Sequence, residues 1–298
     1  MTRAGFVAVI GAPNAGKSTL VNRLVGSKVS IVTRKVQTTR FPIRGVAVVG
    51  ESQIVLVDTP GIFKPRRRLD RAMVGAALRQ AREADVVVHL VDASNNRTAA
   101  PVEGRSTGGL ERASAPMILA LNKIDLASRR DLLPLAERLF GRGDYAEVFM
   151  ISALDGDGVE RLRTRLAELM PSSPWFYPAE QTGDLPARLL AAEITREKLY
   201  ARVHQELPYA AGVETTAFEE RSDGSARIEQ TIFVEREGQR AILLGKDGQT
   251  LKWIGQASRL ELARILDQSV HLFLYVKVKQ NWSEERGLYQ ALGLDFDA

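Results

Sequence analysis

One segment near the start of the chain constrains its fold more than any other feature. Residues 11–18, with the sequence GAPNAGKS, have the spacing GxxxxGK(S/T) and directly follow an apolar run over residues 6–10. This spacing, between a buried strand and a helix, is typical of phosphate-binding loops, whose glycines let successive backbone N–H groups converge on an anion. A helix predicted over residues 17–25 adds its positive N-terminal end. The alternative is an ordinary glycine turn between a strand and a helix.

The side chains of this loop are expected to contact a nucleotide. Lys17 would pair with the β- and γ-phosphates as a catalytic residue, and Ser18 would place its hydroxyl on Mg²⁺. The nucleotide-binding residues predicted in this segment are Gly11, Ala12, Pro13, Asn14, Ala15, Gly16, Lys17, Ser18 and Thr19.

A DTPG motif, residues 58–61, follows the strand pattern of residues 53–57. A phosphate-loop nucleotidase needs a carboxylate at this place for the Mg²⁺ shell and a glycine N–H for the γ-phosphate. Asp58 and Gly61 would supply these two groups. The residues predicted to contact the nucleotide here are Asp58, Thr59, Pro60, Gly61 and Ile62.

Two later motifs indicate a guanine base. Residues 122–125, NKID, follow the buried strand pattern of residues 116–121, and the carboxylate of Asp125 can accept two N–H bonds that guanine offers and adenine does not. Residues 152–153 follow a strand over 148–151, and their backbone would contact the guanine from the other side. Four motifs in this order, each at the carboxyl end of a predicted parallel strand, predict a nucleotide site at that edge of the sheet. The residues predicted around the base are Asn122, Lys123, Asp125, Ser152 and Ala153.

Over residues 6–170 the chain resembles the Ras-like phosphate-loop GTPases. The resemblance implies GTP hydrolysis and a Mg²⁺-binding threonine in switch I, between the first helix and the second strand, where residues 37–40 are QTTR. Thr39 is the first choice for this ligand and Thr38 is the second. The predicted metal ligands are therefore Ser18, Thr39 and Asp58.

The residue after Gly61 departs from the Ras pattern. Ile62 stands where Ras-like enzymes carry the glutamine that orients the attacking water, and an isoleucine cannot do this. Here the chain resembles hydrophobic-substituted bacterial GTPases, several of which use K⁺ held by an asparagine of the phosphate loop. Asn14 stands at that position, where K⁺ would neutralise charge developing between the phosphates, so Asn14 and Thr39 join Lys17 as predicted catalytic residues. The alternative for Asn14 is a turn residue that tolerates unusual backbone angles.

The composition sets further bounds. The chain of 298 residues is long enough for two domains, and its lack of cysteine excludes a disulfide framework, a cysteine-ligated zinc site and thiol catalysis. His89, His204 and His271 are scattered, and we expect core or sheet-face roles for those in predicted strands. The first strand leaves no room for a signal peptide, and no apolar run reaches the length of a membrane span. These features predict a cytoplasmic protein.

A proline-rich stretch predicts a domain boundary. Prolines occur at positions 171, 174, 178 and 186, where they would end the preceding helix and form a semi-rigid connection. The predicted organisation is a GTPase domain over residues 1–170, a linker over 171–186, and a second domain with a C-terminal tail over 187–298.

The second half contains a GxxG motif, GKDG, at residues 245–248. The predicted elements around it are helix 187–206, strands 212–220 and 226–235, a helix, the GxxG turn, a helix to about residue 266 and strand 270–278. This is the element order of a type II KH fold, in which the glycines let a single-stranded nucleic-acid backbone come close. The alternative is a helix hairpin with a tight glycine turn. The predicted RNA-binding residues are Gly245, Lys246, Asp247, Gly248 and Lys252.

The charge distribution limits how RNA could bind. Residues 1–170 carry a net charge of +9 and residues 171–298 a net charge of −4, which together give the +5 of the whole chain. RNA binding by the second half must therefore depend on local clustering around Lys246, Lys252 and Arg259, and not on a global positive field.

Over its whole length the chain resembles the Era family of bacterial ribosome-assembly GTPases, with further support from residues 28–40, 206–209, 234–239 and 275–279. The predicted fold is α/β: a GTPase domain with a central, mostly parallel sheet flanked by helices, followed by an α+β KH domain of type II. The resemblance implies GTP as substrate, Mg²⁺ as cofactor, and binding of the 3′ end of small-subunit (16S) ribosomal RNA during 30S subunit biogenesis. It also implies weak peripheral association with the inner face of the cell membrane, for which the residues themselves give no warrant.

Two alternatives remain at this stage. The first is an RNA-binding scaffold that binds GTP with little turnover, although intact Lys17, Ser18, Asp58 and Asp125 argue against a dead nucleotide site. The second is another Ras-like bacterial GTPase with a different RNA partner. Related GTPases with a transfer-RNA-modification domain or a second phosphate loop are disfavoured, because the sequence contains neither.

Overall fold

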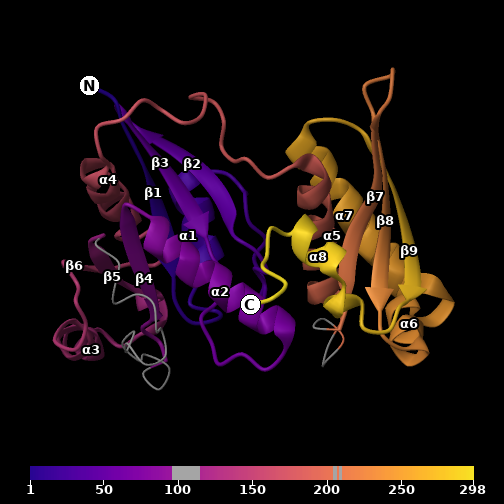
Figure 1. The fold of residues 1–298 in the computed structure, drawn as a ribbon, viewed down its shortest axis with the longest axis horizontal. Coiled ribbons are helices and arrows are strands. Elements are labelled where there is room, and N and C mark those ends of the chain that lie inside the picture. The colour runs from indigo at the N-terminus through magenta and orange to yellow at the C-terminus, as the bar shows by residue number, and fades with distance from the viewer. Residues whose placement is uncertain (96–114, 204–206, 208–209) are drawn as a thin grey trace. The chain divides into compact units, whose positions relative to one another are not determined.

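The structure, a computed structural model, describes residues 1–95, 115–203, 207 and 210–298. The chain forms two compact units (Figure 1). The first comprises Met1–Asp184 together with Tyr289–Ala298, and the second comprises Leu185–Leu288. The segment Tyr289–Ala298 therefore packs with the first unit although it follows the second along the chain.

Among the described residues, the first unit contains a six-stranded sheet with strand order β2-β3-β1-β4-β5-β6. The strands are β1 (Arg3–Ile10), β2 (Ile43–Val49), β3 (Ser52–Asp58), β4 (Val86–Asp92), β5 (Met117–Asn122) and β6 (Glu147–Met150). β2 is antiparallel to β3, and the other neighbouring pairs are parallel. The carboxyl ends of β1, β3, β4 and β5 consequently meet at one edge of the sheet, where the sequence motifs are located.

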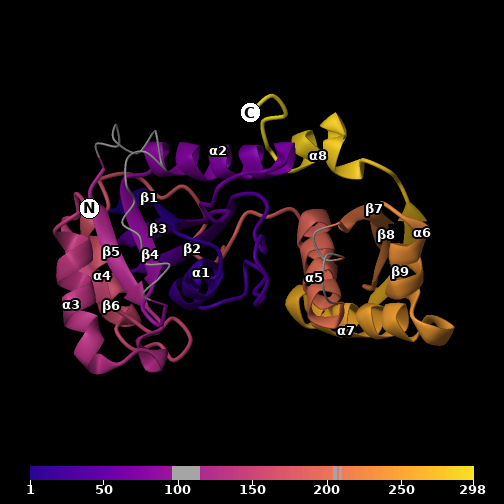
Figure 2. The ribbon, with the colours of Figure 1, turned by 90° about the horizontal axis from the view of Figure 1, so that it is seen from below.

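Helices cover both faces of this sheet, and the pleat of β1 shows how. Val7 and Val9 belong to a buried cluster with α1 (Lys17–Val25) and α4 (Val159–Leu169), whereas the alternate residues Ala8 and Ile10 pack with α2 (Arg68–Glu83). A third cluster buries α3 (Arg129–Phe140) against β5. Figure 2 shows α2 running along one side of the sheet. Burial on both faces explains why every residue of β3 is buried and why its centre, residues 54–57, is a continuous apolar run.

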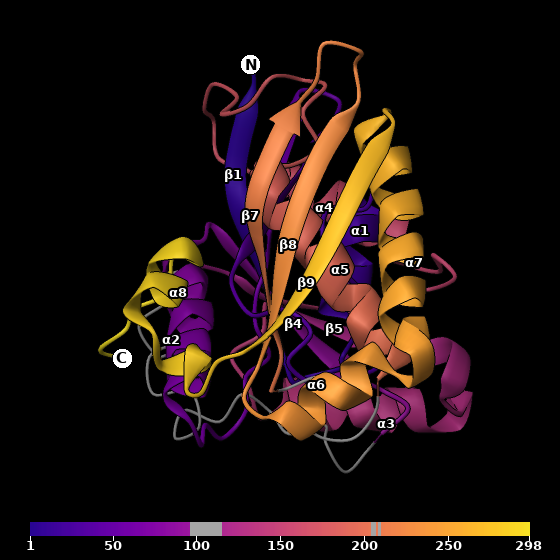
Figure 3. The same ribbon diagram turned by 90° about the vertical axis from the view of Figure 1, so that its right-hand side faces the viewer.

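The second unit is an α+β arrangement. Its elements are α5 (Ala187–Arg202), β7 (Gly212–Glu220), β8 (Ala226–Val234), α6 (Glu237–Leu244), η2 (Lys246–Gly248), α7 (Gln249–Leu266), β9 (Val270–Val278), η3 (Trp282–Glu284) and the start of α8 (Arg286–Ala291). The sheet order is β7-β8-β9, with β8 antiparallel to β7 and parallel to β9. Figure 3 shows α5 and α7 behind the three strands. Exposure alternates along β9, as expected for a sheet with helices on one face only.

The predicted fold class is confirmed, and the element order of the second unit is the predicted one. His89 is buried in β4 and His271 is exposed on β9, while His204 lies outside the described residues. The helix predicted over 187–206 ends at Arg202, because Val203 has an extended backbone (φ −102°, ψ 152°). Residues 204–206 also lie outside the described residues.

The predicted domain boundaries stay a prediction, and the structure adds detail to the proline-rich stretch. Pro171 accepts a backbone hydrogen bond from Ala4 at 3.1 Å, and the Phe176 ring stacks on Phe6 with 5.2 Å between centroids. These contacts hold the stretch on the first unit as far as Asp184.

Candidate functional site

The loop between β1 and α1 is shaped by glycines that no other residue could replace without displacement. A Cβ on Gly11 would lie 2.2 Å from the carbonyl oxygen of Leu90, and one on Gly16 would lie 2.3 Å from the side-chain nitrogen of Asn122. Gly16 has φ 99° and is the N-cap of α1. The backbone N–H groups at the start of α1 are therefore presented at the carboxyl edge of the sheet, as a phosphate site requires.

Lys17 is buried inside this loop. Its Nζ donates hydrogen bonds to the carbonyl oxygens of Gly11 at 3.1 Å and Ala12 at 2.9 Å. Burial lowers the pKa of Lys17 to about 8, and the nearby carboxylate of Asp58 opposes this shift. A phosphate anion beside the ammonium group would stabilise its charge, so the pKa of Lys17 is expected to rise when a nucleotide binds.

The three predicted metal ligands converge. Oδ2 of Asp58 accepts hydrogen bonds from Ser18 Oγ at 2.7 Å and from Thr39 Oγ1 at 3.1 Å, and the two hydroxyl oxygens lie 3.0 Å apart. Oδ1 of Asp58 is buried and accepts no hydrogen bond from the described residues, and burial raises the pKa of this carboxyl group. A compact set of oxygen atoms around an incompletely satisfied carboxylate fits Mg²⁺, which prefers oxygen ligands.

The neighbouring threonine has a different environment. Thr38 Oγ1 donates to the carbonyl oxygen of Lys35 at 2.7 Å and lies 2.6 Å from Thr33 Oγ1, so it is engaged within switch I, the loop between α1 and β2. Thr39 is the threonine that faces Asp58. This geometry favours Thr39 over Thr38 as the metal ligand.

The DTPG loop is bonded to the phosphate-binding loop and to β1. Thr59 Oγ1 donates to the carbonyl oxygen of Val9 at 2.7 Å, and the N–H of Ile62 donates to Gly11 at 3.0 Å. A Cβ on Gly61 would lie 2.8 Å from the ring of Pro13. The side chain of Ile62 packs against an apolar cluster. Ile62 therefore has an anchoring role, in agreement with its inability to orient water.

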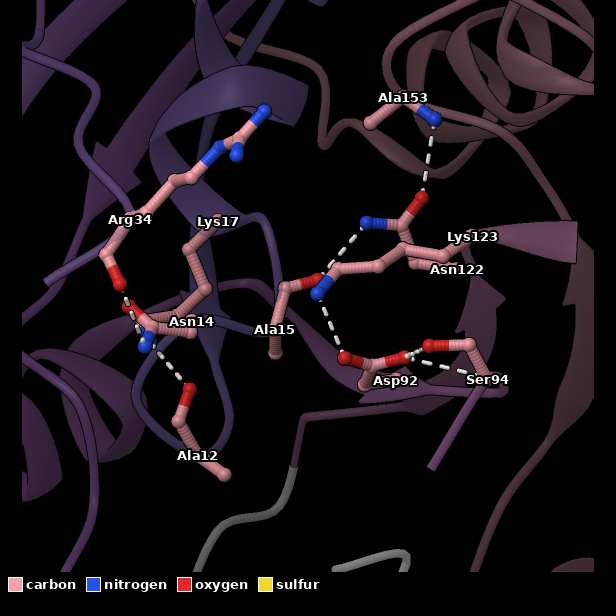
Figure 4. A network of polar contacts seen from close by, with 10 residues as sticks. All are labelled: Ala12, Asn14, Ala15, Lys17, Arg34, Asp92, Ser94, Asn122, Lys123 and Ala153. Atoms are coloured by element: carbon pink, nitrogen blue, oxygen red, sulfur yellow. Dashed lines mark hydrogen bonds and ion pairs between the residues drawn. The ribbon is translucent and has the colours of Figure 1, made fainter. Parts of the chain in front are cut away.

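Asn122, at the end of β5, joins the loops that would surround a base (Figure 4). Its Nδ2 donates to the carbonyl oxygen of Ala15 at 2.7 Å, and its Oδ1 accepts from the N–H of Ala153 at 2.9 Å. Ser152 is buried, whereas Asp125 lies exposed in the short helix η1 (Ile124–Leu126). The structure thus brings the two base motifs beside the phosphate loop and leaves Asp125 open to a ligand.

Asp92 is a member of this network that sequence reasoning missed. Its Oδ2 accepts a hydrogen bond from Lys123 Nζ at 2.5 Å, and its Oδ1 accepts from the backbone N–H of Ser94 at 3.0 Å (Figure 4). The available signal was its place at the carboxyl end of β4, beside the strand that carries Asn122. Asp92 holds the Lys123 side chain along the base site.

Asn14 occupies the position expected for a K⁺ ligand, and its backbone also fits a turn role. Its φ is 61°, in the left-handed region that asparagine tolerates. Its Nδ2 donates to the carbonyl oxygen of Arg34 in switch I at 3.1 Å (Figure 4). The side-chain amide therefore lies against switch I, and both interpretations stay open.

The GxxG turn lies between α6 and α7. Gly245 has φ 70° and Gly248 φ 73°, and Asp247 also has a left-handed backbone, with φ 52°. Lys246, Asp247 and Lys252 are exposed. A Cβ on Gly245 would lie 2.3 Å from Thr250 Oγ1, whereas a Cβ on Gly248 would meet no atom within 4 Å in the part of the chain that the structure describes. The turn therefore presents a bare backbone surface at Gly248.

The comparisons with known proteins cover both halves of the chain. Residues 6–123 match the family of 50S ribosome-binding GTPases, and residues 206–283 match the KH domain family. GTPase Era of Caulobacter vibrioides (strain NA1000 / CB15N) is 67% identical over 308 residues, which cover 99% of this chain and 98% of that protein. The chain belongs to the Era family of GTPases. GTPase Era of Maricaulis maris (strain MCS10) is 56% identical and covers the same shares of the two chains.

Two solved structures of Era share the whole fold of this Era-family chain. Each has a TM-score of 0.90 and 35% identity, and the matches cover 98% of this chain and 99% of the other. One is Era in complex with MgGDPNP and nucleotides 1506–1542 of 16S ribosomal RNA, and the other is an Aquifex aeolicus Era variant bound to GDP·AlF4⁻. The predicted family resemblance is confirmed. No helix among the described residues combines the length and the apolar character needed to cross a membrane.

Proposed function

We propose that this Era-family chain is a GTP-hydrolysing switch that binds the 3′ end of 16S ribosomal RNA and assists 30S subunit biogenesis. The observation that supports the nucleotide site best is the convergence of Ser18, Thr39 and Asp58, because these residues come from the start of α1, from switch I and from the end of β3, and meet through one carboxylate oxygen. The Era relatives crystallised with MgGDPNP and with GDP·AlF4⁻ support the same ligand class.

The residues would divide the work as follows. Lys17 neutralises phosphate charge, and the backbone N–H groups of the loop position the phosphates. Ser18, Thr39 and Asp58 would hold Mg²⁺, which when bound supplies further charge stabilisation at the phosphates. Asp125 would select guanine through two accepted hydrogen bonds, and Asn122 keeps the base loop attached to the phosphate loop.

The GxxG turn is proposed as the RNA contact. Gly245 and Gly248 would admit an RNA backbone, and Lys246 and Lys252 would contact its phosphates. An Era relative crystallised with nucleotides 1506–1542 of 16S ribosomal RNA supports this partner. Asp247 opposes an anion, so its position at the centre of the turn favours an RNA path along the glycines.

We also infer a cytoplasmic location. The absence of cysteine suits a reducing compartment, and the 30S subunit is a cytoplasmic partner. The Era resemblance adds weak association with the inner face of the membrane, which a sedimentation assay with anionic vesicles would test.

The proposal is tested by equilibrium binding of a short 3′-terminal 16S ribosomal RNA oligonucleotide to the GTP-analogue and GDP forms, with GTP hydrolysis followed in parallel. We expect tighter RNA binding in the GTP-analogue form, together with hydrolysis. RNA binding without hydrolysis would instead identify an RNA-binding scaffold. Hydrolysis without binding of this RNA would indicate a GTPase with another RNA partner.

Asn14→Gly is expected to separate the two roles of Asn14. Glycine keeps the left-handed backbone and removes the amide, so GTP affinity should change little while stimulation of hydrolysis by K⁺ over Na⁺ falls about tenfold or more. Asn281→Gly is the matched control, because Asn281 has φ 55° and lies in the second unit. If K⁺ still stimulates hydrolysis equally in Asn14→Gly, Asn14 does not hold K⁺ and has only the turn role.

A further inference from the structure

The first turn of α2 is closed by one buried carboxylate. Oδ2 of Asp70 accepts hydrogen bonds from the backbone N–H groups of Arg66 at 3.0 Å and Arg67 at 3.1 Å. These bonds satisfy N–H groups at the N-terminal end of the helix, where a negative charge is also favourable. Asp70 therefore fixes how the DTPG loop continues into α2.

The other oxygen of Asp70 contacts switch I. Oδ1 of Asp70 accepts a hydrogen bond from Gln37 Nε2 at 3.0 Å. Gln37 has a left-handed backbone, with φ 58°, and stands two residues before Thr39, whose hydroxyl faces Asp58. A displacement of Thr39 would therefore be transmitted through a short, constrained piece of chain to the Gln37 amide and to the start of α2.

The first turn of α2 also contacts the C-terminal segment Tyr289–Ala298, which packs within the same unit. The guanidinium group of Arg68 lies over the Phe296 ring, 4.3 Å from its centroid, and Arg71 Nε donates to the main-chain oxygen of Ala298 at 3.2 Å. Phe296 in turn contacts the fully buried Tyr289 edge-on, with 5.0 Å between ring centroids. The C-terminal segment Tyr289–Ala298, at the yellow end of the chain, lies beside α2 in Figures 2 and 3.

The chain itself connects this contact to the second unit. The helix α8 (Arg286–Ala291) begins in the second unit and ends in the first, because the boundary lies between Leu288 and Tyr289. The packing of Phe296 against Arg68 of α2 therefore restrains the residues that follow β9 along the chain. Three contacts therefore meet in the first turn of α2, at residues 68–71: switch I contacts Asp70, and the segment Tyr289–Ala298 contacts Arg68 and Arg71.

We propose that Asp70 is a positioning residue that ties the Mg²⁺-binding part of switch I to the first turn of α2, and that the segment Tyr289–Ala298 binds this turn and links it to the second unit. The proposal rests on the proposed function, since it requires that guanine nucleotides act on switch I. In this proposal, the Gln37–Asp70 hydrogen bond and the Arg68–Phe296 contact are parts of one connection between switch I and the C-terminal segment.

The first test exchanges the two hydrogen-bonding groups. Gln37→Glu alone would place two carboxylates together and break the link, whereas Gln37→Glu combined with Asp70→Asn would restore it. In the pair, the asparagine oxygen accepts from the N–H groups of Arg66 and Arg67 and its amide donates to the new carboxylate. We expect kcat for GTP hydrolysis to fall at least fivefold in the single variant and to recover to within twofold in the pair. Failure of the pair to recover would overturn the positioning role.

The second test follows the segment directly. Hydrogen exchange of residues 286–298 is compared in the GTP-analogue and GDP forms of the full chain, and we expect at least a threefold difference in exchange rate that disappears in Gln37→Glu and in Phe296→Ala. Arg71→Gln should reduce the difference, whereas Arg82→Gln, in the last turn of the same helix and exposed, is the matched control. Exchange that is indifferent to nucleotide in a chain that binds GTP would overturn this proposal alone. A chain that binds no guanine nucleotide would overturn the proposed function as well.

Discussion

Asp58→Asn is expected to abolish Mg²⁺-dependent GTP hydrolysis while raising the melting temperature of the nucleotide-free protein. The loss of rate follows from the position of Asp58, whose Oδ2 joins Ser18 to Thr39. Removing several kcal/mol of charge stabilisation at the phosphates corresponds to a rate loss of roughly a thousandfold. Single-turnover hydrolysis at saturating GTP and varied Mg²⁺ measures it.

The gain in stability follows from the buried charge. Burial raises the pKa of Asp58 above its ordinary value, so between these two pKa values the folded protein binds more protons than the unfolded chain, and stability falls as pH rises through that window. If the raised pKa lies below 7, Asp58 is ionised at neutral pH and its buried charge destabilises the folded protein in full. Asparagine carries no charge and removes this destabilisation. A rise of roughly 2–4 °C in melting temperature would correspond to about 1 kcal/mol for a domain of this size.

The pH dependence provides the control for this interpretation. The difference in melting temperature between Asp58→Asn and the parent protein should be largest near neutral pH and should shrink as pH falls through the raised pKa. Asp144→Asn, at an exposed carboxylate outside the site, should change neither hydrolysis nor melting temperature appreciably. Retention of Mg²⁺-dependent hydrolysis by Asp58→Asn would remove Asp58 from the metal site.

The nucleotide motifs could be located from the sequence because each is a short run next to a strand pattern. The glycines of residues 11–16 and the oxygen donors Ser18 and Asp58 are set by local spacing, and parallel strands bring their carboxyl ends to one edge. The pattern could not decide between Thr38 and Thr39, since both lie in a loop without periodicity. Their different hydrogen-bond partners are visible only once switch I is folded.

Contacts between distant loops leave no such signal. Asp92 and Lys123 are separated by thirty-one residues, and Gln37 and Asp70 by thirty-three, so neither pair falls within one motif. The segment Tyr289–Ala298 is predicted only as part of a C-terminal tail, and its two aspartates, Asp295 and Asp297, give no sign in the sequence of a packing partner. Its packing on α2 depends on the contact between Phe296 and the guanidinium group of Arg68, two residues that are far apart in the sequence and adjacent only in the fold.

Gly248→Asp is expected to reduce affinity for the 3′-terminal 16S ribosomal RNA oligonucleotide at least tenfold without unfolding the second unit. A Cβ at Gly248 would meet no atom of the described residues within 4 Å, so the added carboxylate causes no clash and projects into the proposed path of the RNA phosphates, at the cost of backbone strain at φ 73°. Gly245→Asp is a poorer test, because its Cβ would lie 2.3 Å from Thr250 Oγ1 and would distort the turn. Fluorescence anisotropy at several salt concentrations measures the affinity and its electrostatic part.

Gly224→Asp is a closely matched control for this substitution. Gly224 lies in the turn between β7 and β8 with φ 77°, against 73° for Gly248, and its Cβ would also meet no atom within 4 Å. Both N–H groups donate a turn hydrogen bond, Gly224 to Arg221 at 3.0 Å and Gly248 to Gly245 at 3.2 Å. Both variants thus add the same charge at a glycine with a similar positive φ, and they differ chiefly in location. A loss of RNA affinity in Gly248→Asp alone would place the RNA at the GxxG turn. Equal losses of affinity in both variants would show that the added negative charge causes the loss wherever it is placed, and would exclude the turn as the specific contact.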